Sequence, residues 1–197
     1  MRRIWIQPWL LCLGLATVNA GAEVPRFAAL QLDPARSEAG FTVKVLWLIG
    51  LHGEFGALRG SLAIDRFRGT ARVDALIDTD TLHMRSKNYE AWARSAEFFD
   101  AQQYPQIHFV SADFPLVRLR TGGVVDGVLS VRGITKPERL RIQPAECAEP
   151  LSGACSVRAE GRIERDDFGM HSRRGTLANT VELRMRIFFA PQDATPP

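Results

Sequence analysis

Cysteine and histidine are scarce in this chain, and neither sign of charge is in large excess. Its 197 residues include 3 Cys and 4 His, and 25 Lys+Arg stand against 22 Asp+Glu. The four histidines are scattered, and no two have the spacing of a familiar helical or hairpin metal pair. The sequence therefore predicts no metal site. Its nearly balanced charge gives no electrostatic reason to expect that it binds nucleic acid.

The motifs of familiar catalytic machinery are missing as well. The nucleophile-elbow pattern Gly-x-Ser-x-Gly does not occur. Asp167-Phe168-Gly169 has the letters of a protein-kinase motif, but neither a glycine-rich nucleotide loop nor a His-Arg-Asp loop accompanies it. Carboxylates gather at residues 164–167 beside Arg165, as is usual in a neutralised turn. We predict no enzyme and no catalytic cofactor, with a hydrolase-type enzyme as an alternative.

The only long apolar run lies at the N-terminus, over residues 4–18, and it is shorter than the roughly 20 residues that would span a bilayer. Two arginines precede it, and residues 18–20 or 20–22 offer a small-residue cleavage pattern. We predict an export signal at 1–22 and therefore a periplasmic or secreted protein, with a retained membrane anchor as the alternative. Removal of the two arginines lowers the formal net charge from +3 to +1.

Cys147 and Cys155 are the cysteines that lie beyond this segment. Pro150 and Gly153 separate them, in a stretch that reads as a turn between two strands. An oxidising compartment would allow the two thiols to pair. We predict a local disulfide, with two free thiols as the alternative.

Alternation of apolar and polar residues dominates the chain from Phe41 onward. The first run extends to Ile49, and similar runs recur later, with glycines between them, which is typical of half-buried strands separated by turns. Many short strands at nearly even spacing indicate an all-β sandwich or barrel, and a barrel removes exposed sheet edges. We predict a single domain over 23–190, followed by a disordered tail at 191–197 that is rich in proline and polar residues.

One stretch breaks this period of two. Between Asp80 and Asp100 the apolar residues approximate helical spacing, and Pro105 ends the segment before the strand that begins near Ile107. A short helix or two lying across a barrel mouth is the prediction for this segment.

Several segments carry a family resemblance. Residues 95–100 read Ser-Ala-Glu-Phe-Phe-Asp and are followed by Tyr-Pro and an Ile-x-Phe-x-Ser strand at 104–111. Residues 127–137 read G-x-L-x-x-x-G-x-T-K-P, and residues 167–170 read Asp-Phe-Gly-Met. With further matches at 53–65 and 77–79 and in a closing strand, the chain resembles the YceI-like family, the lipid or polyisoprenoid-binding proteins of the bacterial periplasm, over about residues 30–190.

The resemblance implies an all-β fold, a lipocalin-like antiparallel β-barrel of about eight strands with a short helical segment near the mouth. It also implies that an elongated apolar tunnel binds and sequesters or transports a long apolar ligand, such as a polyisoprenoid, a quinone or another lipid, and does not change it. A barrel of about eight strands is wide enough to be filled by side chains or to hold one small ligand. The alternative is a periplasmic partner protein that docks on a membrane redox or transport complex.

Inward-facing apolar side chains are the expected tunnel lining, and packing of the same residues into a solid core is the alternative. Arg85, Arg94 and Asp167 are candidates for holding a head group, although each can equally be a solvated surface charge. Relatives often carry His where this chain has Arg36 and Leu46, so head-group binding is expected to differ here. The expected lining residues are Phe41, Val43, Val45, Trp47, Phe55, Ile77, Trp92, Phe98, Phe109, Leu129, Phe168, Met170, Leu183 and Met185.

Overall fold

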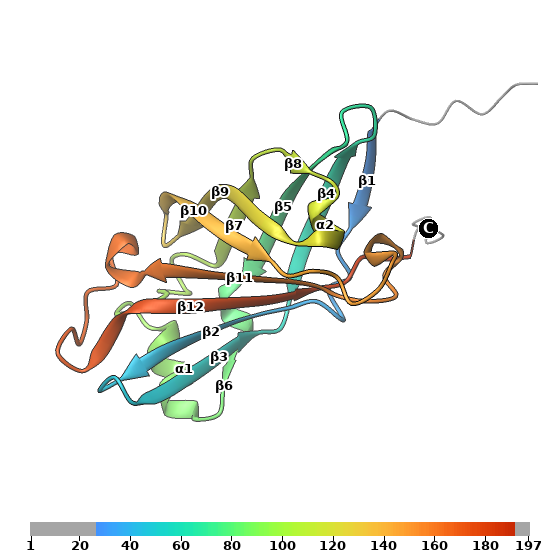
Figure 1. Ribbon diagram of the computed structural model, residues 1–197. Helices are drawn as coiled ribbons and strands as arrows, with labels where there is room; N and C mark the ends of the chain where they lie inside the picture. The colour runs from blue at the N-terminus through green and yellow to red at the C-terminus, as the bar shows by residue number, and fades with distance from the viewer. Residues whose placement is uncertain (1–26, 192–197) are drawn as a thin grey trace, which may run out of the picture.

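A computed structural model describes residues 27–191. Figure 1 shows this part of the chain as one strongly twisted, curled antiparallel sheet with few helices. The helical segments are η1 (Thr79–Thr81), α1 (Lys87–Arg94), α2 (Arg118–Thr121), η2 (Pro150–Ser152) and η3 (Arg165–Phe168). The strands are β1 (Phe27–Gln31), β2 (Glu38–Val45), β3 (Ile49–Phe55), β4 (Leu58–Asp65), β5 (Thr70–Asp78), β6 (Leu82–Met84), β7 (Gln106–Ser111), β8 (Phe114–Pro115), β9 (Gly123–Val131), β10 (Ile134–Ile142), β11 (Val157–Glu164) and β12 (Leu177–Ile187).

The strands pair in the order β1-β4-β5-β7-β9-β10-β11-β12-β2-β3-β6, with β8 beside β5. Just beyond β1, Leu32 bridges to Phe189, and the backbone N–H of Ala190 donates to the carbonyl of Gln31 at 2.9 Å. The two ends of the described chain therefore meet across the curl of the sheet. The predicted antiparallel barrel-type fold is confirmed. The described sheet has twelve strands rather than about eight. Strands as short as β6 and β8 hold too few residues to show a period of two, so alternation in the sequence did not reveal them.

The run of alternation from Phe41 to Ile49 is not one strand, and that prediction was wrong. β2 ends at Val45, the N–H of Leu48 donates to the carbonyl of Val45 at 3.1 Å, and β3 begins at Ile49. Leu46 and Trp47 between them have φ values of 47° and 62°. These values at the two central residues make a type I′ hairpin turn, which usually takes Asn and Gly. Because these turn residues are apolar, the hydrophobic period gave no sign that the chain reverses its direction here.

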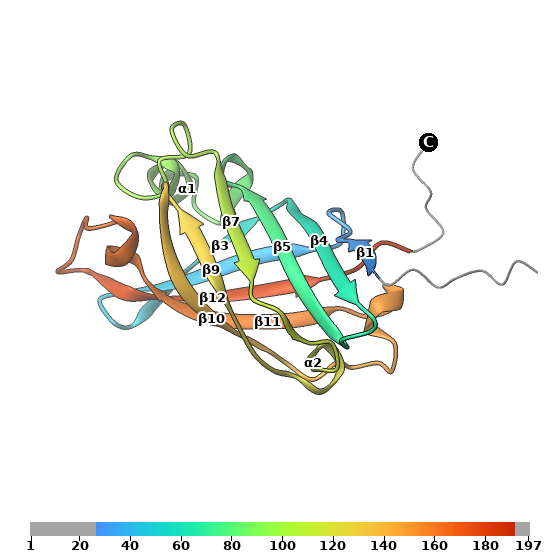
Figure 2. The same ribbon diagram turned by 90° about the horizontal axis from the view of Figure 1, so that it is seen from above.

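The two α-helices lie at opposite ends of the curled sheet, as Figure 2 shows. α1 occupies part of the segment where helical spacing was expected, and α2 lies near the loop that joins β10 to β11. In that loop the sulfur atoms of Cys147 and Cys155 are bonded, with their Cα atoms 6.1 Å apart. The predicted export signal at 1–22 and residues 192–197 of the predicted tail lie outside the described residues. Between residues 27 and 191 there is no helix with the length and apolar character to cross a bilayer.

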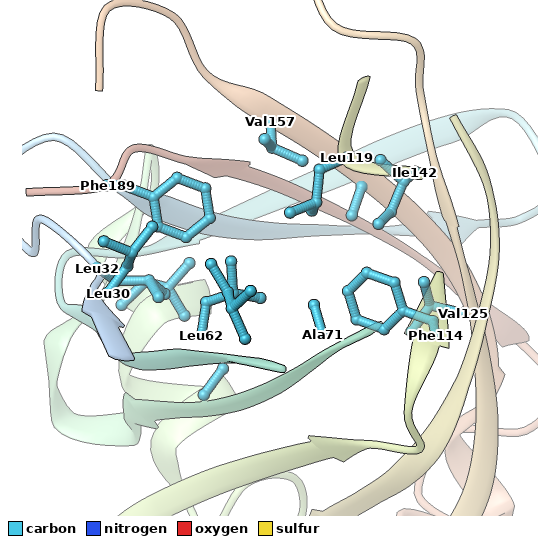
Figure 3. Close-up of a cluster of buried hydrophobic side chains, with 14 of the residues drawn as sticks. Leu30, Leu32, Leu62, Ala71, Phe114, Leu119, Val125, Ile142, Val157 and Phe189 are labelled. Atoms are coloured by element: carbon cyan, nitrogen blue, oxygen red, sulfur yellow. The ribbon is translucent and has the colours of Figure 1, made fainter. Parts of the chain in front are cut away.

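The buried side chains form two clusters inside the sheet. One closes the α2 end, where Leu62 of β4, Leu119 of α2 and Phe189 point into the interior from different elements (Figure 3). The other lies toward α1 and includes Phe41, Phe55 and other inward residues of the long strands. Burial of apolar surface at about 25 cal/mol per Å² drives this curling of the sheet onto itself. The interior between the two clusters is not completely filled.

Candidate functional site

An apolar cavity of about 160 Å³ runs through the interior of the sheet. Residues of both buried clusters line it, from Phe114 and Leu119 near α2 to Trp92 and Ala93 of α1. A cavity needs roughly 10–15 Å³ to hold one water, so the hollow has room for on the order of ten water-sized groups. Its lining is almost entirely hydrocarbon, which suits an apolar chain far better than water.

The hollow exists because several inward positions carry small side chains. Ala39 of β2, Ala75 of β5 and Ala159 of β11 all line the cavity. Larger residues at these positions would fill the space that the curled strands enclose, as side chains do in solid small barrels. Within the curled sheet, the hollow therefore depends on small residues placed among large ones.

Aromatic rings form one wall of the cavity. Phe41, Phe55 and Phe99 have ring centroids 5.9, 5.5 and 5.5 Å apart in pairs, with tilted or edge-to-face geometry. A Cβ added at Gly53 would lie 2.4 Å from the ring of Phe41, so glycine at this position lets the ring lie against the backbone of β3. Edge-to-face rings are a stable arrangement that presents apolar surface to a neighbour.

The cavity reaches the surface beside α1. Tyr89 lines the cavity and is nevertheless 45% exposed, so the opening lies next to it. Trp92 also lines the opening, where its ring packs on Phe98 with centroids 4.2 Å apart and its indole N–H donates to Glu97 at 2.8 Å. The guanidinium carbon of Arg173 lies 4.8 Å from the centre of the Trp92 ring. We call this region, defined by Tyr89, Trp92 and Arg173, the mouth.

Buried Glu90 holds α1 in place at the mouth. Its carboxylate accepts the N–H of Met84 at 3.1 Å, binds Lys87 and lies 3.4 Å from a nitrogen of Arg94. The N–H of Met84 is the largest influence that lowers the pKa of Glu90, and the Lys87 ammonium acts in the same direction. The helix that borders the opening is thus tied to β6.

Two charged residues, Glu138 of β10 and Arg165 of η3, are among those that line the cavity. Arg165 is 1% exposed and donates to the backbone carbonyls of Met170, Leu177 and Ala178, the last at 3.0 Å from Nε. Burial lowers the pKa of its guanidinium. Since its donors are taken up by carbonyls, Arg165 fastens the η3 loop to the start of β12.

Glu138 is the partly buried carboxyl of the lining. Desolvation is the main cause that raises its pKa, and the nearby carboxylates of Asp167 and Glu164 raise it further. A backbone hydrogen bond involving Arg139 acts in the opposite direction. The environment of Glu138 therefore penalises the charged form of the carboxyl more than water does.

Residues 30–189 match the family model described as the YceI-like domain. The chain belongs to the YceI-like family. Among curated relatives, UPF0312 protein ECA1782 of Pectobacterium atrosepticum is 28% identical over 189 residues, covering 92% of this chain and 96% of the relative. Protein YceI of Salmonella arizonae is 28% identical over 174 residues, covering 86% and 89%. The resemblance expected from the sequence motifs is confirmed.

Solved structures of this fold support the architecture of the YceI-like protein. Burkholderia cenocepacia BcnA aligns with a TM-score of 0.66 at 19% identity, covering 79% of this chain and 98% of that one. A polyisoprenoid binding domain from Saccharophagus degradans aligns with a TM-score of 0.59 at 13% identity, covering 84% and 98%. At these identities the likeness shows the shared fold.

Most of the lining residues expected from the sequence do lie on the cavity of this YceI-like protein. They come from strands on all sides of the interior, from α1 and from the segment after η3. Those that line the cavity are Phe41, Val43, Phe55, Ile77, Trp92, Phe98, Phe109, Leu129, Met170, Leu183 and Met185.

Three expected lining residues lie elsewhere. Trp47 is 71% exposed in the β2–β3 turn, because the chain reverses there instead of continuing as a strand. Phe168 is fully buried in the cluster near α1, and half-buried Val45 packs against that cluster, but neither lines the cavity. For Phe168 and Val45 the packed-core alternative is the better description.

The three expected head-group residues do not line the cavity either. Arg85 and Asp167 are exposed, and Arg94 is engaged with Glu90 and with the carbonyl of Leu82. Sequence reasoning missed Glu138 in their place. A signal was present, since Glu138 shares the inward period of two with Leu140 in β10. Among residues 27–191, no three His, Cys, Asp or Glu side chains come together as a metal-binding group.

Proposed function

We propose that this YceI-like protein binds a long apolar molecule in its interior and carries it without changing it. The observation that carries the proposal is the continuous apolar cavity that opens beside Tyr89. Burial of a hydrocarbon chain there gains roughly 25 cal/mol for each Å² of apolar surface removed from water. The likeness to a polyisoprenoid binding domain supports an isoprenoid-like chain as the ligand class.

The size and chemistry of the cavity limit how much of a ligand it can hold and which head group it favours. Room for on the order of ten water-sized groups accommodates a segment of a long chain, so the remainder extends through the mouth. Glu138, a carboxyl on the cavity lining whose pKa is raised by desolvation, disfavours an anionic group inside and favours an uncharged head group. A quinone or an isoprenoid alcohol therefore fits better than a phosphate.

We also propose that the protein works outside the cytoplasm. The sequence at residues 1–22 has the pattern of an export signal. The bond between Cys147 and Cys155 supports the same conclusion, because disulfides persist in oxidising compartments. Fractionation of host cells tests this proposal, and recovery of the protein in the cytoplasmic fraction would contradict it.

Two neighbouring residues of β9 provide a matched test of the carrier function. Leu129 lines the cavity, whereas Val128 is 43% exposed on the outside of the sheet. Binding of a medium-chain ubiquinone analogue is measured by co-elution in gel filtration. We expect one molecule bound per chain in the wild type and in Val128→Trp, and little or none in Leu129→Trp. Equal binding by the two variants would contradict binding inside the sheet.

A further inference from the structure

The turn between β2 and β3 exposes four consecutive apolar side chains. Leu46, Trp47, Leu48 and Ile49 are 52%, 71%, 88% and 61% exposed. Leu46 and Trp47 also hold positive φ values, which bulky side chains rarely adopt and which Asn and Gly adopt easily. Neither packing nor turn geometry explains these residues. We call residues 46–49 the apolar tip.

The apolar tip lies at the same end of the molecule as the mouth. The N–H of Leu46 donates to the carbonyl of Thr176 at 2.8 Å, in the loop that leads into β12. The same loop carries Arg173, whose guanidinium lies over the ring of Trp92 at the mouth. Figures 1 and 2 both show the β2–β3 turn, the loop before β12 and α1 at one end of the sheet, far from α2.

Cationic side chains flank the apolar tip. Lys44 and Arg173 are exposed, and within residues 27–191 neither lies within ion-pair distance of a carboxylate. Arg174 is also exposed and pairs with Asp166 at 3.1 Å. A tryptophan among aliphatic residues with Lys and Arg beside it is the composition of segments that sit at a membrane surface. The cations complement the charge of anionic lipid head groups.

A bilayer fits the apolar tip better than a protein partner does. A stable protein interface buries about 800 Å² on each partner, and four side chains on one convex turn offer much less. Insertion into a bilayer needs no complementary surface, and its strength scales with the apolar area that leaves water.

We propose that the apolar tip inserts into the head-group region of a bilayer that contains anionic phospholipid, and that the mouth then faces the membrane. An apolar ligand can pass between the bilayer and the cavity without crossing water. This use of the contact rests on the proposed carrier function, whereas the insertion itself does not.

Vesicle flotation tests the insertion. The probe is vesicles of phosphatidylethanolamine and phosphatidylglycerol, and the variant is Leu46→Asn/Trp47→Gly, which suits a type I′ turn and keeps the hairpin folded. We expect the wild type to float with the vesicles and the partition coefficient of the variant to fall by about tenfold or more, as loss of two buried apolar side chains implies. Phe67→Ser is the matched control, since Phe67 is 86% exposed at the β4–β5 turn on the other end of the sheet, and it should float like the wild type.

Three results would overturn the proposal. The first is absence of the wild type from the vesicle fraction, and the second is flotation of the tip variant to the same extent as the wild type. The third is flotation only when membrane protein is added, which would assign the apolar tip to a protein partner. The ubiquinone-analogue assay on the same samples separates this proposal from the carrier function. Flotation without ligand binding would contradict the carrier function alone, and ligand binding without flotation would contradict the insertion alone.

Discussion

Filling the cavity from inside should stabilise the protein, which is opposite to the usual effect of a larger side chain in a core. Ala75 of β5 lines the cavity, so Ala75→Phe places a ring into open space. At about 24 cal/mol per Å³, an empty hollow of 160 Å³ costs the folded state about 4 kcal/mol. A ring that fills a third to a half of it should recover about 1–2 kcal/mol of unfolding free energy.

Ala71 is the matched control for this substitution. It lies four residues earlier on β5, shares the inward face and is 2% exposed in the cluster of Figure 3, but it is not among the residues that line the cavity. Ala71→Phe overpacks a filled site and should cost about 1–3 kcal/mol.

Urea unfolding of both variants measures the difference, with the midpoint converted to free energy at an unchanged m value. We expect Ala75→Phe to exceed Ala71→Phe by at least about 2 kcal/mol. The reasoning fails if Ala75→Phe loses as much stability as Ala71→Phe, because the interior at Ala75 would then be solid.

Three further predictions concern groups at and away from the cavity. Arg165→Met should lower the unfolding free energy by at least about 3 kcal/mol in urea titration, since three backbone carbonyls lose a buried donor; a loss below about 1 kcal/mol would contradict its structural role. The folded-state pKa of Glu138 is raised, so its ionisation opposes folding, and stability should fall as pH rises from the usual carboxyl pKa through the raised one. The unfolding free energy of Glu138→Gln should therefore equal that of the wild type in acid and exceed it near neutral pH. A difference in unfolding free energy between the two proteins that does not change with pH would contradict the raised pKa. Replacing Cys147 and Cys155 by Ser should cost about 2–3 kcal/mol for a loop of this length, and equal melting of the variant and the oxidised wild type would contradict this value.

The parts of the fold that follow from periodicity were predictable from the sequence. β11 alternates inward and outward residues along its whole length, and β12 does so from Val181 onward, where its inward members Leu183 and Met185 line the cavity. The helix near the mouth followed from the break in that period at residues 80–100. The family motifs then distinguished a barrel from a sandwich, which alternation alone did not do.

Other features depend on tertiary context that no local pattern carries. The turn at Leu46 and Trp47 was missed because its residues are apolar and lack the Asn-Gly signal of a type I′ turn. Glu138 was missed because a charged residue on an alternating strand is ordinarily assigned to solvent. The hollow itself depends on how much space the strands enclose around Ala75 and Ala159, which their sequence does not state.

Native mass spectrometry of the protein, released from its own host cells without detergent, tests the central claim most directly. The account predicts a species heavier than the polypeptide by the mass of one apolar molecule, which solvent extraction recovers unchanged. Leu129→Trp from the same host should lack this added mass, and Val128→Trp should retain it. A wild-type protein that carries no such molecule, and that takes up none when the ubiquinone analogue is supplied, would contradict the account.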